Sequence, residues 1–135
     1  MTKKEWIDAK LKIVKELEIL TDEEVIIQEH LINDNYLVPH DNLIFLCSRQ
    51  NFNSRINSLL HEAGHVIIFH LSDRDFTDSQ KGITNEYKID FLQQEILAWN
   101  YGYELSNSLD LDIDYDLFNK HARKHLLEYI RWVEL

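Results

Sequence analysis

Residues 54–71 read SRINSLLHEAGHVIIFHL, a stretch without proline whose second half carries apolar residues on nearly every side. A helix that is apolar all round is a buried helix, so this stretch predicts a helix inside the core. His61, Glu62 and His65 form the pattern H-E-x-x-H within it. Residues four apart share a helix face, and both imidazoles can therefore reach one ion about 2.0–2.1 Å away.

Glu62 lies about 100° round the helix from His61. It is poorly placed there to bind the ion and well placed to contact a water on it, the general-base position in metallopeptidases of this pattern. Burial of these polar groups is costly unless each has a partner, and a metal with its water supplies one for all three. The alternative is two core histidines bonded to backbone carbonyls. Gly64 suits a place where another backbone or a substrate comes close.

The metzincin continuation of this motif requires glycine three residues and histidine six residues after the second histidine. Those positions are Ile68 and Leu71, so the sequence excludes that class. His70 falls at a different offset, roughly opposite His61, and is predicted to be a polar residue at the helix end.

Glu95 is the best candidate for the third protein ligand that a zinc peptidase site needs beside its open water position. It belongs to a helix predicted within the segment 87–103 and lies in the apolar stripe of that helix. Its apolar neighbours on the wheel are Phe91, Leu92, Ile96, Trp99 and Gly102. Acids seldom occupy such positions unpaired. The alternative is a buried acid that a tyrosine or an arginine hydrogen-bonds.

Three segments together resemble the ImmA/IrrE-type zinc metallopeptidase domains of bacteria and their mobile elements, which are gluzincin-like. The segments are the strand-like run 42–47, the motif at 59–66, and Glu-x-x-Ala-Trp at 95–99. The resemblance covers about residues 40 to 105. Members often carry a helix-turn-helix domain or act on a repressor encoded nearby, and this chain leaves no room for an appended DNA-binding domain.

The resemblance implies that His61, His65 and Glu95 bind Zn²⁺ and that Glu62 is the catalytic base. The oxyanion of the reaction needs a further donor besides zinc. Tyr103, on the Glu95 face of its helix, and Tyr87, ahead of that helix, are both candidates, and the sequence does not choose between them.

Composition limits the number of domains, the class of partner and the compartment. The 135 residues, 44% of them hydrophobic, predict one domain over residues 1–135. A formal net charge of −10 argues against a nucleic-acid backbone as the partner. The mixed charged and apolar start is neither a signal peptide nor a membrane anchor, and Cys47 is the lone cysteine. We therefore expect a cytoplasmic protein without membrane attachment; the oligomeric state stays open.

The rest of the chain predicts an α+β fold. Residues 3–20 have the spacing of an amphipathic helix, and residues 25–27 and 36–38 read as strands joined by a turn at 33–35. With a third strand at 43–47 they predict a small, mostly antiparallel sheet ahead of the zincin-like active-site helix pair. Its edge strand would be available to bind an extended peptide.

Two acidic stretches are predicted to be structural. Asp73, Asp75 and Asp78 are expected to form turns and helix caps in the loop between the two site helices. The alternating aspartates of 110–116 lack the glycine of a calcium loop, and one of them is expected to cap the next helix.

A C-terminal helix is predicted at about 115–133, with His121 and His125 four residues apart on it. A second metal pair is geometrically possible there. The neighbouring cations disfavour one, and a structural role is expected for both histidines; the cations are Lys120, Arg123 and Lys124.

The sequence thus predicts a zinc-dependent endopeptidase acting on a specific protein or peptide substrate, with a transcriptional regulator among the candidate targets. The alternative is a binding or inhibitory protein that keeps a zincin fold and acts through its acidic surface. A purely structural zinc site fits less well, because such sites usually fill all four positions with cysteine or histidine.

Overall fold

The computed structural model describes residues 1–71 and 85–135. Its helices are α1 (Lys3–Thr21), α2 (Phe52–Leu71), α3 (Asn85–Ser108) and α4 (Tyr115–Glu134). Its strands are β1 (Ile26–His30), β2 (Tyr36–Val38) and β3 (Leu43–Cys47), with a short 3₁₀ helix η1 (Pro39–Asp41) before β3. The expected turn-forming aspartates at 73, 75 and 78 lie outside the described residues.

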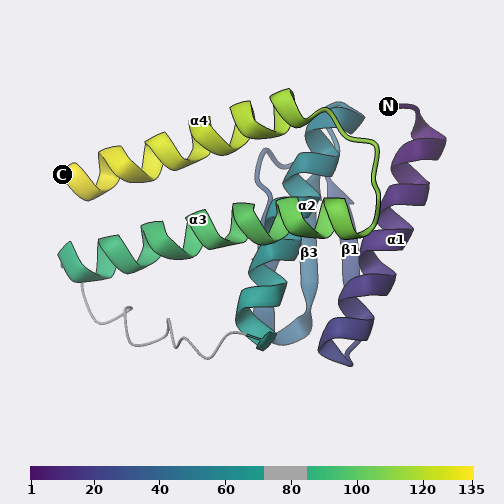
Figure 1. Ribbon diagram of the computed structural model, residues 1–135, viewed down its shortest axis with the longest axis horizontal. Helices are drawn as coiled ribbons and strands as arrows, with labels where there is room; N and C mark the ends of the chain where they lie inside the picture. The colour runs from purple at the N-terminus through teal and green to yellow at the C-terminus, as the bar shows by residue number, and fades with distance from the viewer. Residues whose placement is uncertain (72–84) are drawn as a thin grey trace.

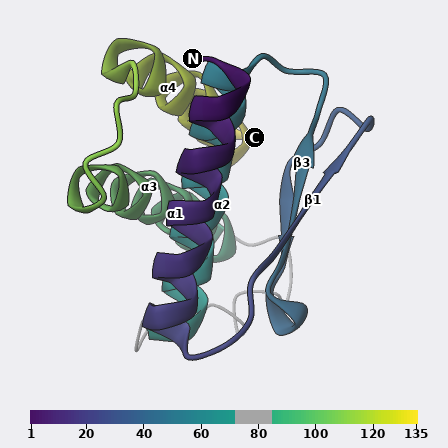
Figure 2. The same ribbon diagram turned by 90° about the vertical axis from the view of Figure 1, so that its right-hand side faces the viewer.

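The predicted α+β class is confirmed: four helices accompany a three-stranded sheet in the described ranges. The helices α1 and α2 lie between the sheet on one side and α3 and α4 on the other (Figure 2). α3 and α4 run side by side in opposite directions and reach well beyond the sheet (Figure 1). α2 therefore contacts every other layer of the fold.

The pairing of the strands differs from the expected one. The strand order is β1-β3-β2, with β1 parallel and β2 antiparallel to β3, so β1 and β2 do not form a hairpin. The physical reason is burial: Ile44 and Leu46 of β3 have no exposed surface, whereas β1 is largely exposed. The most apolar strand takes the centre, where both of its edges are paired.

α1 packs one face against α2, as its sequence spacing predicts. The buried residues of α1 are Trp6, Ala9, Ile13 and Leu17, which recur every three to four positions. Its first turn is closed by a capping box in which Thr2 Oγ1 accepts from the Glu5 N–H and Glu5 Oε1 accepts from the Thr2 N–H. The helix is thus fixed at its start and along its inner face.

α2 is the buried helix that its composition predicts. Ten of its residues are buried, including His61, Glu62 and Gly64. Arg55 in its first turn ties it to the sheet, because its guanidinium lies 2.7 Å from Glu29 of β1. The polar motif is therefore held within the apolar interior.

α4 begins as expected at an aspartate. Asp114 is its N-cap, and the Asp114 carboxylate accepts a hydrogen bond of 3.1 Å from the Leu117 N–H. In the part of the chain that the structure describes, no helix combines the length and the apolarity that crossing a membrane would require.

Candidate metal centre

His61 and His65 project from the same face of α2, as their spacing predicts. Their Nε2 atoms are 3.2 Å apart and their ring centroids 4.8 Å apart. His61 is 7% exposed, so its ring lies almost wholly inside the protein. The two imidazoles face one common point from successive turns of the helix.

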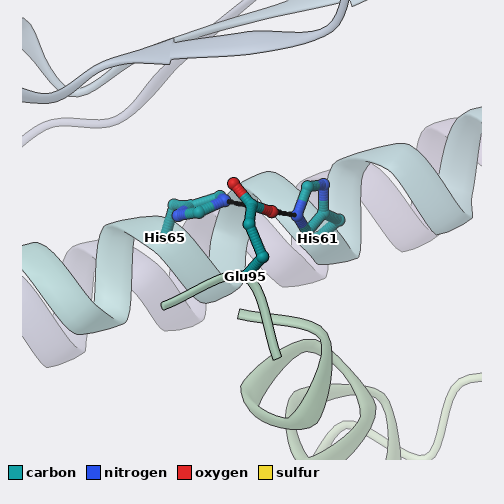
Figure 3. A group of neighbouring side chains, drawn as sticks. All are labelled: His61, His65 and Glu95. Atoms are coloured by element: carbon teal, nitrogen blue, oxygen red, sulfur yellow. Dashed lines mark hydrogen bonds and ion pairs between the residues drawn. The ribbon is translucent and has the colours of Figure 1, made fainter. Parts of the chain in front are cut away.

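Glu95 reaches that point from α3 and lies between the two imidazoles (Figure 3). Its Oε2 atom is 2.7 Å from His61 Nε2 and 3.3 Å from His65 Nε2. The residue is 5% exposed. The three residues singled out in the sequence are thus brought together in space, although thirty positions separate His65 from Glu95.

The spacing of these donor atoms suits one tetrahedral cation. Ligand atoms about 2.0–2.1 Å from a tetrahedral zinc ion are about 3.3 Å from one another. The separations of 3.2 Å between the two Nε2 atoms and 3.3 Å between His65 and Glu95 match that edge. The distance of 2.7 Å between His61 and Glu95 is shorter, as befits a hydrogen bond. The donors therefore fit a metal with small adjustment.

Two glycines set how closely α2 and α3 approach. A Cβ on Gly64 would lie 1.9 Å from the carbonyl oxygen of Ala98, and one on Gly102 would lie 2.5 Å from that of Leu60. Neither position has room for a side chain. The expectation that Gly64 marks a close backbone approach is confirmed, and the approaching backbone is that of the helix that carries Glu95.

The three defined residues of the Glu-x-x-Ala-Trp segment of α3 all contact the motif on α2. Glu95 enters the cluster, Ala98 one turn later lies against Gly64, and Trp99 stacks on His61. The Trp99 and His61 rings have centroids 4.4 Å apart and planes inclined by 9°. This stacking fixes the plane of the His61 ring and hence the direction of its Nε2 atom.

Glu62 lies beside the cluster without joining its centre. Its Oε1 is 3.6 Å from His61 Nδ1, on the opposite side of that ring from Nε2, and the residue is 5% exposed. Burial raises the pKa of Glu62 to about 7. A carboxyl group with a pKa near neutrality can take up and release a proton under physiological conditions.

The protonation states of His61 and Glu95 suit metal binding, whereas the surroundings of His65 favour its protonated form. Burial lowers the pKa of His61 to about 4, so this ring is neutral at pH 7. Burial would raise the pKa of Glu95, but hydrogen bonds from His125, His61 and His65 lower it, and the group is a carboxylate. For His65, burial lowers the pKa, but the hydrogen bond to Glu95 and the negative charges of Glu95 and Glu62 together outweigh burial and raise it. Neutral imidazole and ionised carboxylate are the forms that bind a cation.

His125 of α4 also joins the cluster, which the sequence reasoning missed. Its Nε2 lies 3.2 Å from Glu95 Oε2, and its ring centroid is 4.8 Å from that of His61. The cations that argued against a second metal pair are all exposed, and water screens their charge; they are Lys120, Arg123 and Lys124. His125 follows Phe118 by seven residues and precedes Tyr129 by four, and this helical spacing on the inner face of α4 was the available signal.

His121 lies one turn before His125 and has a different neighbour. Asn57 Nδ2 donates to His121 Nδ1 over 3.0 Å, which links α4 to α2. The expected structural role agrees with this contact. His70 likewise lies apart from the cluster, in a hydrogen bond of 2.6 Å between its Nε2 and Asn42 Oδ1.

The structure places the two expected oxyanion donors away from the cluster. The ring of Tyr103 lies against Tyr115, with centroids 5.3 Å apart, and the ring of Tyr87 lies against Phe91 and Trp132. Each is eight residues from Glu95, about 12 Å along the helix axis. Tyr103 was expected on the Glu95 face of its helix, but a separation of eight residues carries it along the axis and about 80° round it. Tyr87 was expected in the loop before this helix and instead lies within α3, which begins at Asn85. Tyr129 of α4 interacts with Glu95.

Two cavities border the cluster and share Asn35, His61, Glu62 and His125 in their linings. The first, of about 590 Å³, is polar, and its other residues include Asp34, Gln50, Ser58 and Lys124. The second, of about 440 Å³, is more apolar, and its other residues include Leu37, Pro39, Phe69, Phe91 and Tyr129. The cluster therefore lies where two chemically different cavities meet.

In comparisons with known proteins, no family model, curated protein or solved structure matches this chain.

Proposed function

We propose that this protein is a zinc-dependent endopeptidase of the ImmA/IrrE type. The observation that carries the proposal is the convergence of His61, His65 and Glu95 on one point, with Glu62 beside it. Three protein donors leave one position for water, which is the arrangement of catalytic zinc sites. The cavities on either side of the cluster leave space for a chain that extends past it.

In this proposal His61, His65 and Glu95 would hold the ion, and a zinc ion held there would supply Lewis-acid chemistry to the scissile carbonyl and to the attacking water. Glu62 accepts the proton of the attacking water and then donates it to the leaving amine. Its buried position and its pKa of about 7 suit both transfers. Trp99 keeps the His61 ring in place by stacking.

An extended peptide is the proposed form of the substrate. β2 is an edge strand of the described sheet, and Tyr36 and Leu37 of β2 line the apolar cavity. The residues just before it, Asn33 and Asp34, line the polar cavity. A peptide would pair slightly more stably antiparallel to β2 than parallel to it. In the antiparallel direction the peptide would run from the apolar cavity to the polar cavity, with a large apolar residue before the scissile bond and polar residues after it.

Substitution Glu62→Gln tests the catalytic part of the proposal. Glutamine keeps the shape of the side chain but cannot take up the proton, so the variant should bind one zinc ion as the wild type does and lose cleavage by at least about 100-fold. The wild type and Glu62→Gln, each loaded with zinc, are incubated with a library of peptides derived from denatured proteins. Mass spectrometry then identifies the cleavage products. Cleavage by the wild type alone, after apolar residues, is the expected result.

Equal cleavage by the wild type and Glu62→Gln would contradict the role of Glu62.

A second candidate function is that of a binding or inhibitory protein, which the formal net charge of −10 favours. In that case neither the wild type nor Glu62→Gln would cut the library, and Glu62→Gln would leave the biological activity intact.

The proposed compartment is the cytosol. The lone cysteine, Cys47, is buried and free, and free thiols are typical of the reducing cytosol.

A further inference from the structure

We propose that His125 is a positioning residue that holds the Glu95 carboxylate in its metal-binding orientation from outside the ligand set. The inference rests on the metal-binding part of the proposed function. It concerns a residue of α4, a helix that contributes none of the three proposed ligands.

Three imidazoles converge on one oxygen atom. His61, His65 and His125 each place Nε2 within 2.7–3.3 Å of Glu95 Oε2. A carboxylate can only accept hydrogen bonds, so His125 must donate through Nε2–H in its contact with this atom. Its ring is partly exposed, with 34% of the side chain open to solvent, and Nε2 is its inner nitrogen.

A cation at the centre would divide the three histidines into two groups. His61 and His65 would direct unprotonated Nε2 atoms to the ion and could no longer donate to Glu95. His125 is the one of the three that is outside the group of donors that fit a metal. It can keep its proton and its hydrogen bond to the carboxylate.

The neighbourhood of His125 favours a fixed ring. Its centroid lies 4.8 Å from that of His61, 5.8 Å from that of Trp99 and 5.1 Å from that of Tyr129. The Tyr129 hydroxyl also interacts with Glu95, one helical turn further along α4. Glu95 is thus bordered by polar groups of α4 as well as by the histidines of α2.

Partners that orient a metal ligand typically contribute 10-fold to 100-fold to metal affinity. The expected size of the effect distinguishes a positioning residue from a ligand, because the ligand atoms around the ion stay the same when His125 is changed. The ring of His125 also borders both cavities.

The test is the dissociation constant of Zn²⁺, measured by competition with a chromogenic chelator. His125→Leu removes the donor and keeps an apolar side chain of similar size, whereas His125→Gln retains an N–H near the Nε2 position. His125→Leu should bind zinc about 10-fold to 100-fold more weakly. His125→Gln should recover most of that loss. His121→Leu, one turn away and in contact with Asn57, is the matched control and should leave the affinity within about 3-fold.

The absorption spectrum of the cobalt-loaded proteins supplies the second readout. An unchanged d–d spectrum in cobalt-saturated His125→Leu supports positioning, and a changed coordination number shows that His125 is itself a ligand and overturns the inference. Equal zinc affinity of the wild type and His125→Leu also overturns it, with the proposed function intact. Absence of zinc binding by the wild type would remove both proposals together.

Discussion

At the scale of single residues, the candidate site depends on how three side chains share one point. Glu95 contributes the only carboxylate at the centre of the described cluster, and both α2 histidines contact the same oxygen of it. A buried carboxylate between two imidazoles is an expensive arrangement unless its charge is satisfied. Within the protein, the hydrogen bonds that lower the pKa of Glu95 stabilise its negative charge. A bound cation would stabilise this charge more strongly.

Glu95→Ala should therefore reduce zinc affinity strongly, by at least about 100-fold, because the ion loses one of three protein ligands and the only anionic one. Metal analysis of purified wild type and variant after dialysis against a fixed zinc buffer gives the measurement. Tight zinc binding of equal stoichiometry in both proteins would show that Glu95 is not a ligand. Glu104→Ala, an exposed change further along α3, is the control.

The residues of the site differ in how readily the sequence reveals them. His61, Glu62 and His65 are visible in a five-residue motif, and Glu95 is visible because an acid within an apolar stripe is unusual. His125 carries neither signal. Its spacing from Phe118 and Tyr129 places it on the inner face of α4, but its contact with Glu95 depends on how α4 packs beside α3, which is a property of the tertiary structure.

At the scale of elements, the crossing of α2 and α3 determines the distance between the two ligand-bearing helices. Backbone atoms, not side chains, are in contact at Gly64 and at Gly102. Such contacts cannot be relieved by a change of rotamer. The geometry of the cluster is thus tied to the packing of the two helices.

Gly64→Ala should destabilise the protein even though alanine is the better helix former by about 1 kcal/mol. The added methyl group would overlap the Ala98 carbonyl and push the helices apart, at an overpacking cost of about 1–3 kcal/mol or more. Urea unfolding followed by circular dichroism measures the loss. Gly102→Ala, where an added methyl group would overlap its neighbour less, should cost less. A stability gain in Gly64→Ala would contradict the close approach.

The sheet shows where local patterns stop being informative. The three strands were recognisable from β-branched and aromatic residues, and their bounds are close to the expected ones. Their pairing could not be recognised. A turn signal at 33–35 is compatible both with a hairpin and with a loop between two strands that do not pair, and the sequence does not state which strand lies in the middle. The pairing follows from the burial of Ile44 and Leu46 in β3, a strand that packs against α2.

At the scale of the whole molecule, the candidate metal centre joins helices from three parts of the chain. α2 supplies two histidines, α3 supplies the carboxylate, and α4 supplies His125. A cation bound there would connect elements whose other contacts are largely apolar. Binding of a ligand to the folded state alone raises the free energy of unfolding.

Metal removal should lower the stability of the entire fold. At a free zinc concentration about 100 times the dissociation constant, the expected stabilisation is about 2.7 kcal/mol. For a chain of this size that corresponds to a change in melting temperature of roughly 10 °C. Differential scanning calorimetry with zinc and with excess chelator measures it. The shift should vanish in Glu95→Ala, and an identical shift in that variant would indicate zinc binding elsewhere.

The glycine contact between α2 and α3 also bears on protein design. A designer who grafts H-E-x-x-H onto another helix pair would transfer the imidazoles and the base but not the interaxial spacing that brings the carboxylate into range. The transferable unit includes the glycine within the motif, the small residue three positions after the glutamate, and the tryptophan that follows it. Scaffolds with bulkier residues at that crossing would hold the third ligand too far away to close the site.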